Sequence, residues 1–530
     1  MTEIQENLLG LVKEIDDICK KNDITYYISY GSLIGAVRHG GFIPWDDDVD
    51  IQMTRDNAEK FKNAVEAEKL ENREVFIQSD NYRSMNVQWR YVNTSSTTLI
   101  RGLIGSGAVQ GQFVDIFILS PMPVEKEKKE KCVEDYRLYK ELKAQNTSYE
   151  TTYSQDYLKR YHRAKRWEKL IGTKRILNYL EKKMFNYPED EATEYLIRTL
   201  MGRLIIPKAW YGNPRYVKFE TLEVPIPKYA EKILNYTFGT LWFEMPIYEE
   251  HGEHIFISDM EIPYSVYTAD YDKHLDVDNF FKEQVKRKEY WFNLLQNRNV
   301  INPHIYKLKG MCLSAEIQQT VERYGIDLKK LVENGCEREL EIIFKSYFDM
   351  MNTSVVKYWE TYIDMPDEYL NAAIYFRLFN GNLSLASYVL WLRRTRVTRD
   401  LSSDLKRLSA LCDATFMLLN TLYGDCDLKK SRSIVDEWIR KEPDALYFMR
   451  ADIYLKLEEA DPDGTDELIA LCDKYLQKYE KDGELLKYRG DLLLKKGDTA
   501  EAEKCYKKAL CNLKNGYCIT EIKAYFEAKN

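Results

Sequence analysis

The N-terminal region places apolar and polar residues with the period of a helix. From Ile4 to Ile18 an apolar side chain recurs every three or four positions, which predicts an amphipathic helix with a solvated charged face. Asn22 and Asp23 favour turns and are expected to end this helix. The chain should therefore open with a surface helix packed on a core.

A strand, a tight turn and a short helix are predicted next. Residues 24–30 are rich in β-branched and aromatic side chains, Gly31 and Ser32 follow, and residues 33–37 form a short apolar run. A glycine-rich loop over residues 38–44 then leads to a second strand around residues 49–53. This spacing allows the two strands to lie side by side.

Further strands and helices alternate up to about residue 120. Thr54 is expected to cap a helix that runs to about residue 65, and strand-like runs recur at residues 74–78, 86–92 and 112–119. Strands mixed with helices predict an α/β (α+β) core.

The composition then changes in two steps. Residues 124–200 are rich in Lys, Glu, Tyr and Leu at helical spacing. In residues 210–263, proline, glycine and aromatic residues again interrupt the chain at short intervals. Both are expected to complete the first domain. The predicted organisation is an α/β domain over residues 1–265, a helical connector over residues 266–349, and an all-α domain over residues 350–530.

The last domain contains a repeated order of large and small residues, in which Tyr447, Ala451 and Tyr454 reproduce the beginning of a later unit. Small residues at such positions allow paired helices to approach closely. The pattern predicts a tetratricopeptide-like helical solenoid, and an unrelated helical bundle is the alternative. The later unit comprises Leu486, Gly490, Leu493, Gly497, Ala502, Tyr506 and Ala509.

The length, net charge and cysteine content of the chain limit the kinds of protein that it can be. A chain of 530 residues needs more than one core, and its net charge of -8 provides no general field for polyanions, so we expect no nucleic acid as the main partner. Any phosphate-binding surface must be local. Ten cysteines without a C-x-x-C pair are expected to be reduced thiols. With neither a signal peptide nor a transmembrane segment in the sequence, we expect a cytoplasmic protein.

Two carboxylates are the first candidates for chemistry. On a strand, Asp48 and Asp50 share one face while Val49 and Ile51 face the core. Paired carboxylates repel unless a cation lies between them, and hard oxygen ligands suit Mg²⁺ or Mn²⁺. A solvated acidic turn is the alternative, and it is the role expected for the preceding two aspartates.

Asp115 is a third candidate, because it is the one charge in the apolar run QFVDIFIL. A buried unpaired carboxylate is costly, so a metal ion, neutral burial or a salt bridge must explain it. Gly31 and Ser32 can bring backbone N–H groups close to a phosphate.

Three basic residues are candidates for substrate binding. Arg38 and His39 stand beside a Gly-Gly pair, and Arg90 lies on a predicted strand. A guanidinium fork suits phosphate oxygens, so these residues are expected to contact phosphate or a leaving nucleotide, with salt bridging as the alternative.

At these residues the sequence resembles the LicD family, phosphotransferases that decorate bacterial surface glycans and share a nucleotidyltransferase core with fukutin-type proteins. The resemblance lies in residues 31–51 (GSLIGAVRHGGFIPWDDDVDI) and 112–123 (QFVDIFILSPMP). Residues 219–246 resemble the closing portion of the family, but Tyr236 to Thr240 departs from its usual Tyr-Gly-Asp. By position the resemblance implies metal ligands at Asp48, Asp50 and Asp115.

The resemblance also implies a reaction. A CDP-activated alcohol such as choline or ribitol would be the donor, and a hydroxyl of a glycan or lipid-linked glycan would be the acceptor, with CMP as the leaving group. The helical repeats would then bind the glycan carrier or a protein partner, and peripheral association with the inner face of the cell membrane is compatible with this role. The alternatives are an NTP-dependent nucleotidyltransferase and a non-catalytic scaffold.

Overall fold

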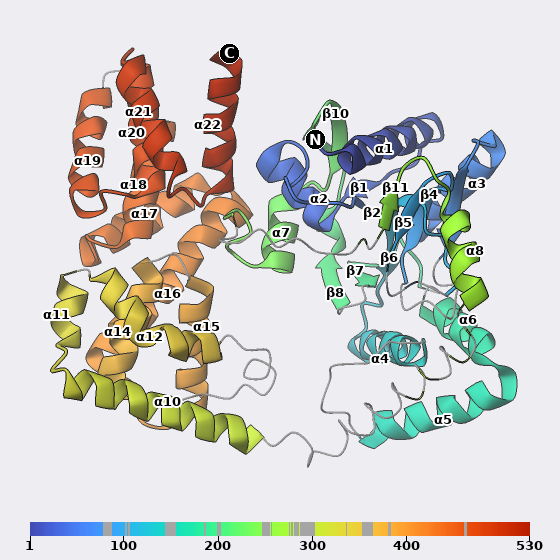
Figure 1. The fold of residues 1–530 in the computed structure, drawn as a ribbon, viewed down its shortest axis with the longest axis horizontal. Helices are drawn as coiled ribbons and strands as arrows, with labels where there is room; N and C mark the ends of the chain where they lie inside the picture. The colour runs from blue at the N-terminus through green and yellow to red at the C-terminus, as the bar shows by residue number, and fades with distance from the viewer. Residues whose placement is uncertain are drawn as a thin grey trace. The chain divides into compact units, whose positions relative to one another are not determined.

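The computed structural model divides the chain into two compact units, residues 1–297 and 298–530 (Figure 1). The predicted domain limits at residues 265 and 350 fall on either side of this division. The structure describes residues 1–77, 87–100, 103, 106–143, 155–184, 187–198, 203–245, 255, 257–274, 276, 279, 283, 286, 303–334, 336–351, 364–379, 383–459 and 464–529.

A seven-stranded mixed sheet forms the centre of the first unit (Figure 1). Five strands follow the order β1-β2-β6-β4-β3, and β7 and β8 extend the sheet from the end of β6. The pairing of β2 with β6 is parallel, and the other pairings are antiparallel. The strands are β1 (Tyr27–Ile28), β2 (Asp50–Thr54), β3 (Arg73–Ile77), β4 (Trp89–Asn93), β6 (Gln112–Pro121), β7 (Glu194–Arg198) and β8 (Arg203–Pro207).

The strands predicted from the sequence lie at these places, with ends that differ by a few residues. Residues 78 and 86, the predicted end of one strand and start of another, lie outside the described residues. Two further pairs of strands lie beside the main sheet. They are β9 (Arg215–Phe219) with β10 (Leu222–Ile226), and β5 (Thr97–Leu99) with β11 (Ile257–Asp259).

One face of the sheet carries the hydrophobic core under two helices, α1 (Glu3–Lys21) and α3 (Arg55–Glu68). The ring of Tyr91 on β4 lies 5.5 Å from that of Phe61 on α3, and its hydroxyl donates to Glu14 on α1. Thr54 accepts a hydrogen bond from the N–H of Asn57, which confirms the predicted helix cap. Because strand residues alternate, the opposite face is free to carry polar side chains.

The first unit contains further helices besides α1 and α3. The chain turns after β1 into α2 (Tyr30–Ile34) and a π-helix (Gly35–His39), so Arg38 and His39 end a helix instead of beginning the predicted loop. Gly40 ends this helix because its φ of 65° suits glycine. The remaining helices are η4 (Lys208–Trp210), α4 (Lys126–Leu142), α5 (Gln155–Ile171), α6 (Thr173–Met184), α7 (Ala230–Phe238) and α8 (Tyr264–His274).

In the described residues of the second unit, the elements of secondary structure are helices joined by loops (Figure 1). In its last part α20 and α21 form a hairpin in which Gly490 approaches Tyr506, at two positions of the predicted repeat. The tetratricopeptide assignment itself stays a prediction. The helices are α10 (Pro303–Arg323), α11 (Leu328–Glu333), α12 (Glu337–Met351), α14 (Asp367–Phe379), α15 (Leu383–Arg396), α16 (Ser403–Leu419), η5 (Asn420–Asp425), α17 (Leu428–Lys441), α18 (Leu446–Glu459), α19 (Thr465–Lys478), α20 (Gly483–Lys495), α21 (Thr499–Leu510) and α22 (Gly516–Lys529).

No helix within the described ranges combines the length and the apolar character needed to cross a bilayer. All ten cysteines are free thiols, and Cys312, Cys426 and Cys511 are the exposed ones.

Candidate functional site

Three charged side chains lie in one row across the centre of the sheet. In the pairing register Asp50 of β2 stands opposite Asp115 of β6, and Asp115 stands opposite Arg90 of β4. Paired residues on neighbouring strands point to the same face, so the row lies on the face away from α1 and α3. Val49 and Ile51, which flank Asp50, are fully buried on the core side, as the alternation of the sequence predicts.

Arg90 and Asp115 form a buried ion pair. Nε of Arg90 donates to Oδ1 of Asp115 over 2.6 Å, and Nε2 of Gln88 donates to Oδ2 over 3.2 Å. Arg90 is 2% exposed and Asp115 is 7% exposed. The salt bridge offered as an alternative for Asp115 is therefore present, and both carboxylate oxygens accept hydrogen bonds.

One nitrogen of the Arg90 guanidinium takes no part in the ion pair with Asp115. The guanidinium carbon lies 3.5 Å from the centre of the Phe113 ring, which holds the fork in place. The Nη1 atom is buried and has no hydrogen-bond partner among the described residues. A buried donor without a partner is costly, so an anionic ligand at this atom would satisfy it.

Asp48 lies in a loop before β2 instead of on the strand where the sequence analysis expects it. The strand begins at Asp50, although the carbonyl of Val49 already accepts from the N–H of Asp115. Asp48 clusters with Asp46 and Asp47, and one carboxylate oxygen from each lies within 4.8 Å of the others. The sequence analysis missed these two neighbours, because a run of aspartates after Pro-Trp reads as a solvated turn.

The carboxylates of the loop and of β2 share one electrostatic environment. Desolvation, followed by repulsion from Asp48 and Asp47, raises the pKa of Asp46 to about 8. Desolvation, followed by repulsion from Asp48 and Asp115, raises the pKa of Asp50 well above its usual range. Negative charge is thus concentrated between the loop and the two parallel strands, and a divalent cation bound there would relieve the repulsion.

The donor set fits Mg²⁺ or Mn²⁺. Every candidate ligand is a carboxylate oxygen, the type that these hard cations prefer, and no thiol or imidazole takes part in the cluster. Asp46, Asp47 and Asp48 have the closest mutual geometry, and Asp50 lies near enough to Asp48 to feel its charge. Asp115 is outside this group and is paired with Arg90, so metal binding by Asp115 stays a prediction.

The predicted Gly-Ser turn is part of helix α2, because Gly31 and Ser32 lie within Tyr30–Ile34, and it contacts the acidic loop. Ser32 Oγ accepts a hydrogen bond of 3.0 Å from the N–H of Asp50, which fixes the start of β2. A Cβ atom on Gly31 would lie 3.2 Å from Oδ2 of Asp46, so only a small residue leaves that carboxylate undisturbed. Contact of this turn with a phosphate stays a prediction.

The guanidinium of Arg38 bonds to protein carbonyls. Its Nη1 donates to the carbonyl oxygens of Trp242 (2.8 Å) and Glu244 (2.9 Å), and the residue is 4% exposed. Nε donates to Nδ1 of His39 over 3.4 Å. These contacts give Arg38 a supporting role in the fold, while phosphate contact by Arg38 or His39 stays a prediction.

Two distant residues hold the loops around the cluster. The buried amide of Gln5 donates to the carbonyl of Asp46 over 3.0 Å. Glu220, in the turn between β9 and β10, accepts from the N–H of Phe42, and a Cβ on Gly41 would lie 2.0 Å from its Oε1. A side chain at position 41 would therefore displace the carboxylate of Glu220 from this contact.

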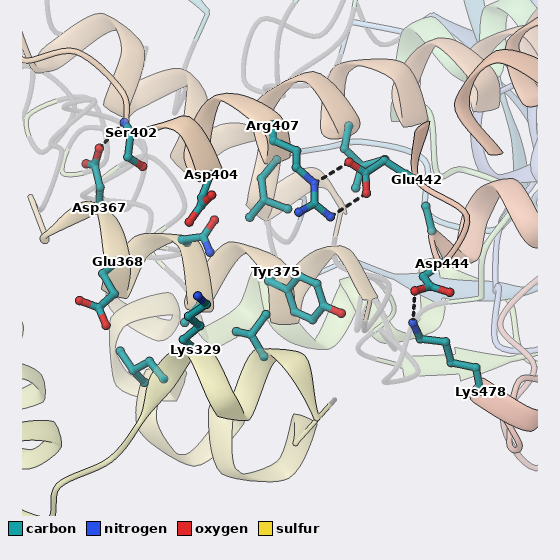
Figure 2. A pocket seen from close by; sticks show the side chains of 17 residues that line it. Lys329, Asp367, Glu368, Tyr375, Ser402, Asp404, Arg407, Glu442, Asp444 and Lys478 are labelled. Atoms are coloured by element: carbon teal, nitrogen blue, oxygen red, sulfur yellow. Dashed lines mark hydrogen bonds and ion pairs between the residues drawn. The ribbon is translucent and has the colours of Figure 1, made fainter. Parts of the chain in front are cut away.

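A separate groove of about 640 Å³ lies in the second unit, between α11, α14, α16 and the residues after α17 (Figure 2). Tyr375 lies near its middle, and apolar residues such as Leu408 and Val332 also line it. Arg407 is held by two hydrogen bonds to Glu442, and Glu368 and Asp404 are in no ion pair with the described residues. The groove therefore combines an aromatic ring with hydrogen-bonding side chains.

Comparison with known proteins identifies the part of the chain that bears the site. Residues 23–103 match the family LicD/FKTN/FKRP, nucleotidyltransferase domain. The lipopolysaccharide cholinephosphotransferase LicD of Haemophilus influenzae is 30% identical over 125 residues, 24% of this chain and 46% of that protein. An uncharacterized protein of Rickettsia typhi is 43% identical over 59 residues, 11% of this chain and 19% of that protein.

An uncharacterized protein of Rickettsia prowazekii is 51% identical over 45 residues, 8% of this chain and 17% of that protein. The chain thus spans less than half the length of each of these relatives. The family match includes Asp48, Asp50 and Arg90, but it ends before Asp115 and the second unit. These similarities support the LicD family, and with it a transferase role at family level, for the segment that carries the acidic loop.

Proposed function

We propose that the first unit transfers a phospho-alcohol group, phosphocholine or a similar group, from a CDP-activated donor to a hydroxyl of a cell-surface glycan. The observation that carries the proposal is the concentration of carboxylates around Asp48 and Asp50 within the segment that matches the family. The named relative from Haemophilus influenzae is a cholinephosphotransferase, which supports this class of group.

Asp46, Asp48 and Asp50 would hold Mg²⁺ or Mn²⁺, with Asp115 at the edge of the site. The bound cation would neutralise negative charge on the diphosphate of the donor. We assign the buried Nη1 of Arg90 to a phosphate oxygen of the donor, because this donor group has no partner among the described residues.

The acceptor hydroxyl attacks the phosphorus distal to the nucleoside, the new P–O bond forms, and the bond to CMP breaks. The hydroxyl proton passes to a carboxylate of the cluster. Asp115 is poorly placed for this step, because both of its oxygens already accept from Arg90 and Gln88. We therefore assign the proton to Asp48 or Asp50, at a carboxylate oxygen that does not bind the cation.

The decisive experiment follows CMP release from a panel of CDP-alcohols with Mg²⁺ and a glycan acceptor. Asp50→Asn should lose at least about a hundredfold in kcat, because an amide binds a divalent cation weakly. Asp17→Asn, an exposed acid on α1, is the matched control and should keep the wild-type rate. Wild-type turnover in Asp50→Asn would contradict the proposal.

Two rival functions make different products. An NTP-dependent nucleotidyltransferase would release pyrophosphate from an NTP and leave CDP-alcohols intact. A non-catalytic scaffold would release neither, and Mg²⁺ would not raise the melting temperature of the full chain.

The groove of the second unit is our candidate for binding the glycan acceptor. Sugar rings pack on aromatic faces and their hydroxyls bond to charged and amide groups, which are the groups around Tyr375. Tyr375→Ala should raise the acceptor KM with little change in donor cleavage. An unchanged acceptor KM would favour a protein partner at this groove.

A cytoplasmic location, at the inner face of the cell membrane, is part of this proposal. Ten cysteines that form no disulfide are typical of a reducing compartment.

A further inference from the structure

The hairpin of α5 and α6 is strongly basic within an acidic chain. Residues 155–184 contain ten Lys or Arg and three Asp or Glu, a local excess of seven positive charges, whereas the whole chain has a net charge of -8. Such a reversal of sign in thirty residues creates a local field that can attract an anionic surface.

The inner faces of the two helices are packed against the protein. Tyr157, Tyr161 and Ala164 of α5 share a buried core with Ile176 and Leu180 of α6 and with residues of α4. Between the helices a single residue, at position 172, makes the corner with a φ of 86°. The hairpin is thus anchored from one side, and its outer side faces solvent.

Large apolar side chains lie on that outer side. Leu170 is 79% exposed, Trp167 is 53% exposed and Tyr179 of α6 is 62% exposed. At helical spacing, Arg163, Arg166, Trp167 and Leu170 share one face of α5, opposite the packed residues. Single exposed apolar residues are ordinary, but an indole, a phenol and a leucine among cations are typical of a helix that lies in a membrane interface.

Most of the outer cations are not neutralised by the protein. Arg160, on the inner edge, bonds to Glu134 and lies close to Asp135, and Lys183 pairs with Asp135. By contrast, six exposed cations make no ion pair with the described residues. They are Arg163, Arg166, Lys169, Lys174, Arg175 and Lys182.

We propose that the outer face of the α5–α6 hairpin docks the protein on an anionic lipid bilayer. The unpaired cations would meet lipid phosphates, and Trp167, Leu170 and Tyr179 would enter the interface between headgroups and acyl chains. Nucleic acid fits less well, because a phosphate backbone would satisfy the cations but offer no apolar environment for Leu170. This surface is separate from the acidic site and goes beyond the proposed transfer reaction.

The test is sedimentation of the full chain with vesicles of equimolar phosphatidylcholine and phosphatidylglycerol, compared with vesicles of phosphatidylcholine alone. We expect binding to the anionic vesicles only. Arg163→Glu/Arg166→Glu/Arg175→Glu should lower the partition coefficient by at least about a hundredfold, since each basic residue near an anionic surface contributes roughly fivefold and the new carboxylates add repulsion. Circular dichroism melting should show that the variant remains folded.

The matched control is Lys429→Glu/Lys508→Glu/Lys523→Glu, which changes the net charge equally through exposed lysines of the second unit. It should keep binding within about twofold of the wild type. Equal losses in the two triple variants would overturn the proposal, because they would show attraction by net charge alone.

Apolar insertion is tested by Trp167→Ala/Leu170→Ala. This variant should bind about tenfold more weakly, and the deficit should persist in high salt, which screens the charges but not the burial of apolar area. Binding of duplex DNA without binding of vesicles, or a double variant that binds vesicles like the wild type, would overturn the proposal. None of these outcomes depends on the transfer reaction.

Discussion

Removing the cation of the buried Arg90–Asp115 pair should destabilise the first unit strongly. The two side chains are 3% and 9% exposed, so water cannot replace the lost partner. Opposite charges about 4 Å apart attract by about 4 kcal/mol at an effective dielectric constant near 20. Breaking such a pair leaves a buried carboxylate, and Arg90→Leu should therefore lower the free energy of unfolding by about 3–5 kcal/mol.

Urea denaturation followed by circular dichroism, with limited proteolysis to separate the two units, measures this loss. Arg90→Leu/Asp115→Leu removes both charges and should regain most of the stability. Lys128→Leu, which removes a cation from the exposed pair with Glu125, is the control and should leave the unfolding curve unchanged. A loss below about 1 kcal/mol in Arg90→Leu, the range of exposed pairs, would refute the reasoning.

Three further changes test other parts of the structure. In EDTA, the free energy of unfolding should fall as the pH rises from about 4 to about 8. Burial and the neighbouring carboxylates raise the pKa of Asp46 to about 8 in the folded chain, so in this range the folded chain holds a proton that the unfolded chain has lost. Asp46→Asn should flatten this dependence in thermal melts, and a slope unchanged by that substitution would count against it. Gly41→Ala should cost about 1–3 kcal/mol through its clash with Glu220, and Glu220→Ala should relieve most of the cost in urea titrations. Gly490→Ala places a Cβ 2.5 Å from the Tyr506 ring and should lower the free energy of unfolding by a similar amount, about 1–3 kcal/mol. The loss should be smaller when Tyr506→Leu is made with it, and equal losses in both backgrounds would contradict this packing.

Local periodicity predicts the strands of the site but not their neighbours. Alternation around Asp50 and the apolar run around Asp115 give both strands and the correct buried faces, since these depend on residues close in the sequence. The insertion of β6 between β2 and β4 depends on pairing across the whole domain. The partnership of Arg90 with Asp115 follows from that order, and the sequence could offer it only as one alternative.

The contacts of the acidic loop are the other feature that local sequence could not predict. A run of aspartates has the same composition in a solvated turn as in a ligand cluster, so Asp46 could not be assigned from the sequence. The contacts of Gln5 with the acidic loop and of Glu220 with Gly41 join segments that no local pattern relates. Arg38 was expected at a phosphate, and its bonds to the carbonyls of Trp242 and Glu244 could be seen only in three dimensions.

The position of β6 also bears on how this protein can be divided. The family match ends at residue 103, yet the strand in the middle of the sheet order is Gln112–Pro121. A fragment trimmed to the match would leave the edges of β2 and β4 unpaired, and unpaired edges recruit other chains. During synthesis β2 and β4 cannot join through β6 until its residues have emerged, so Asp115 reaches Asp50 only after that point, whereas the aspartates of the loop are already neighbours in the sequence.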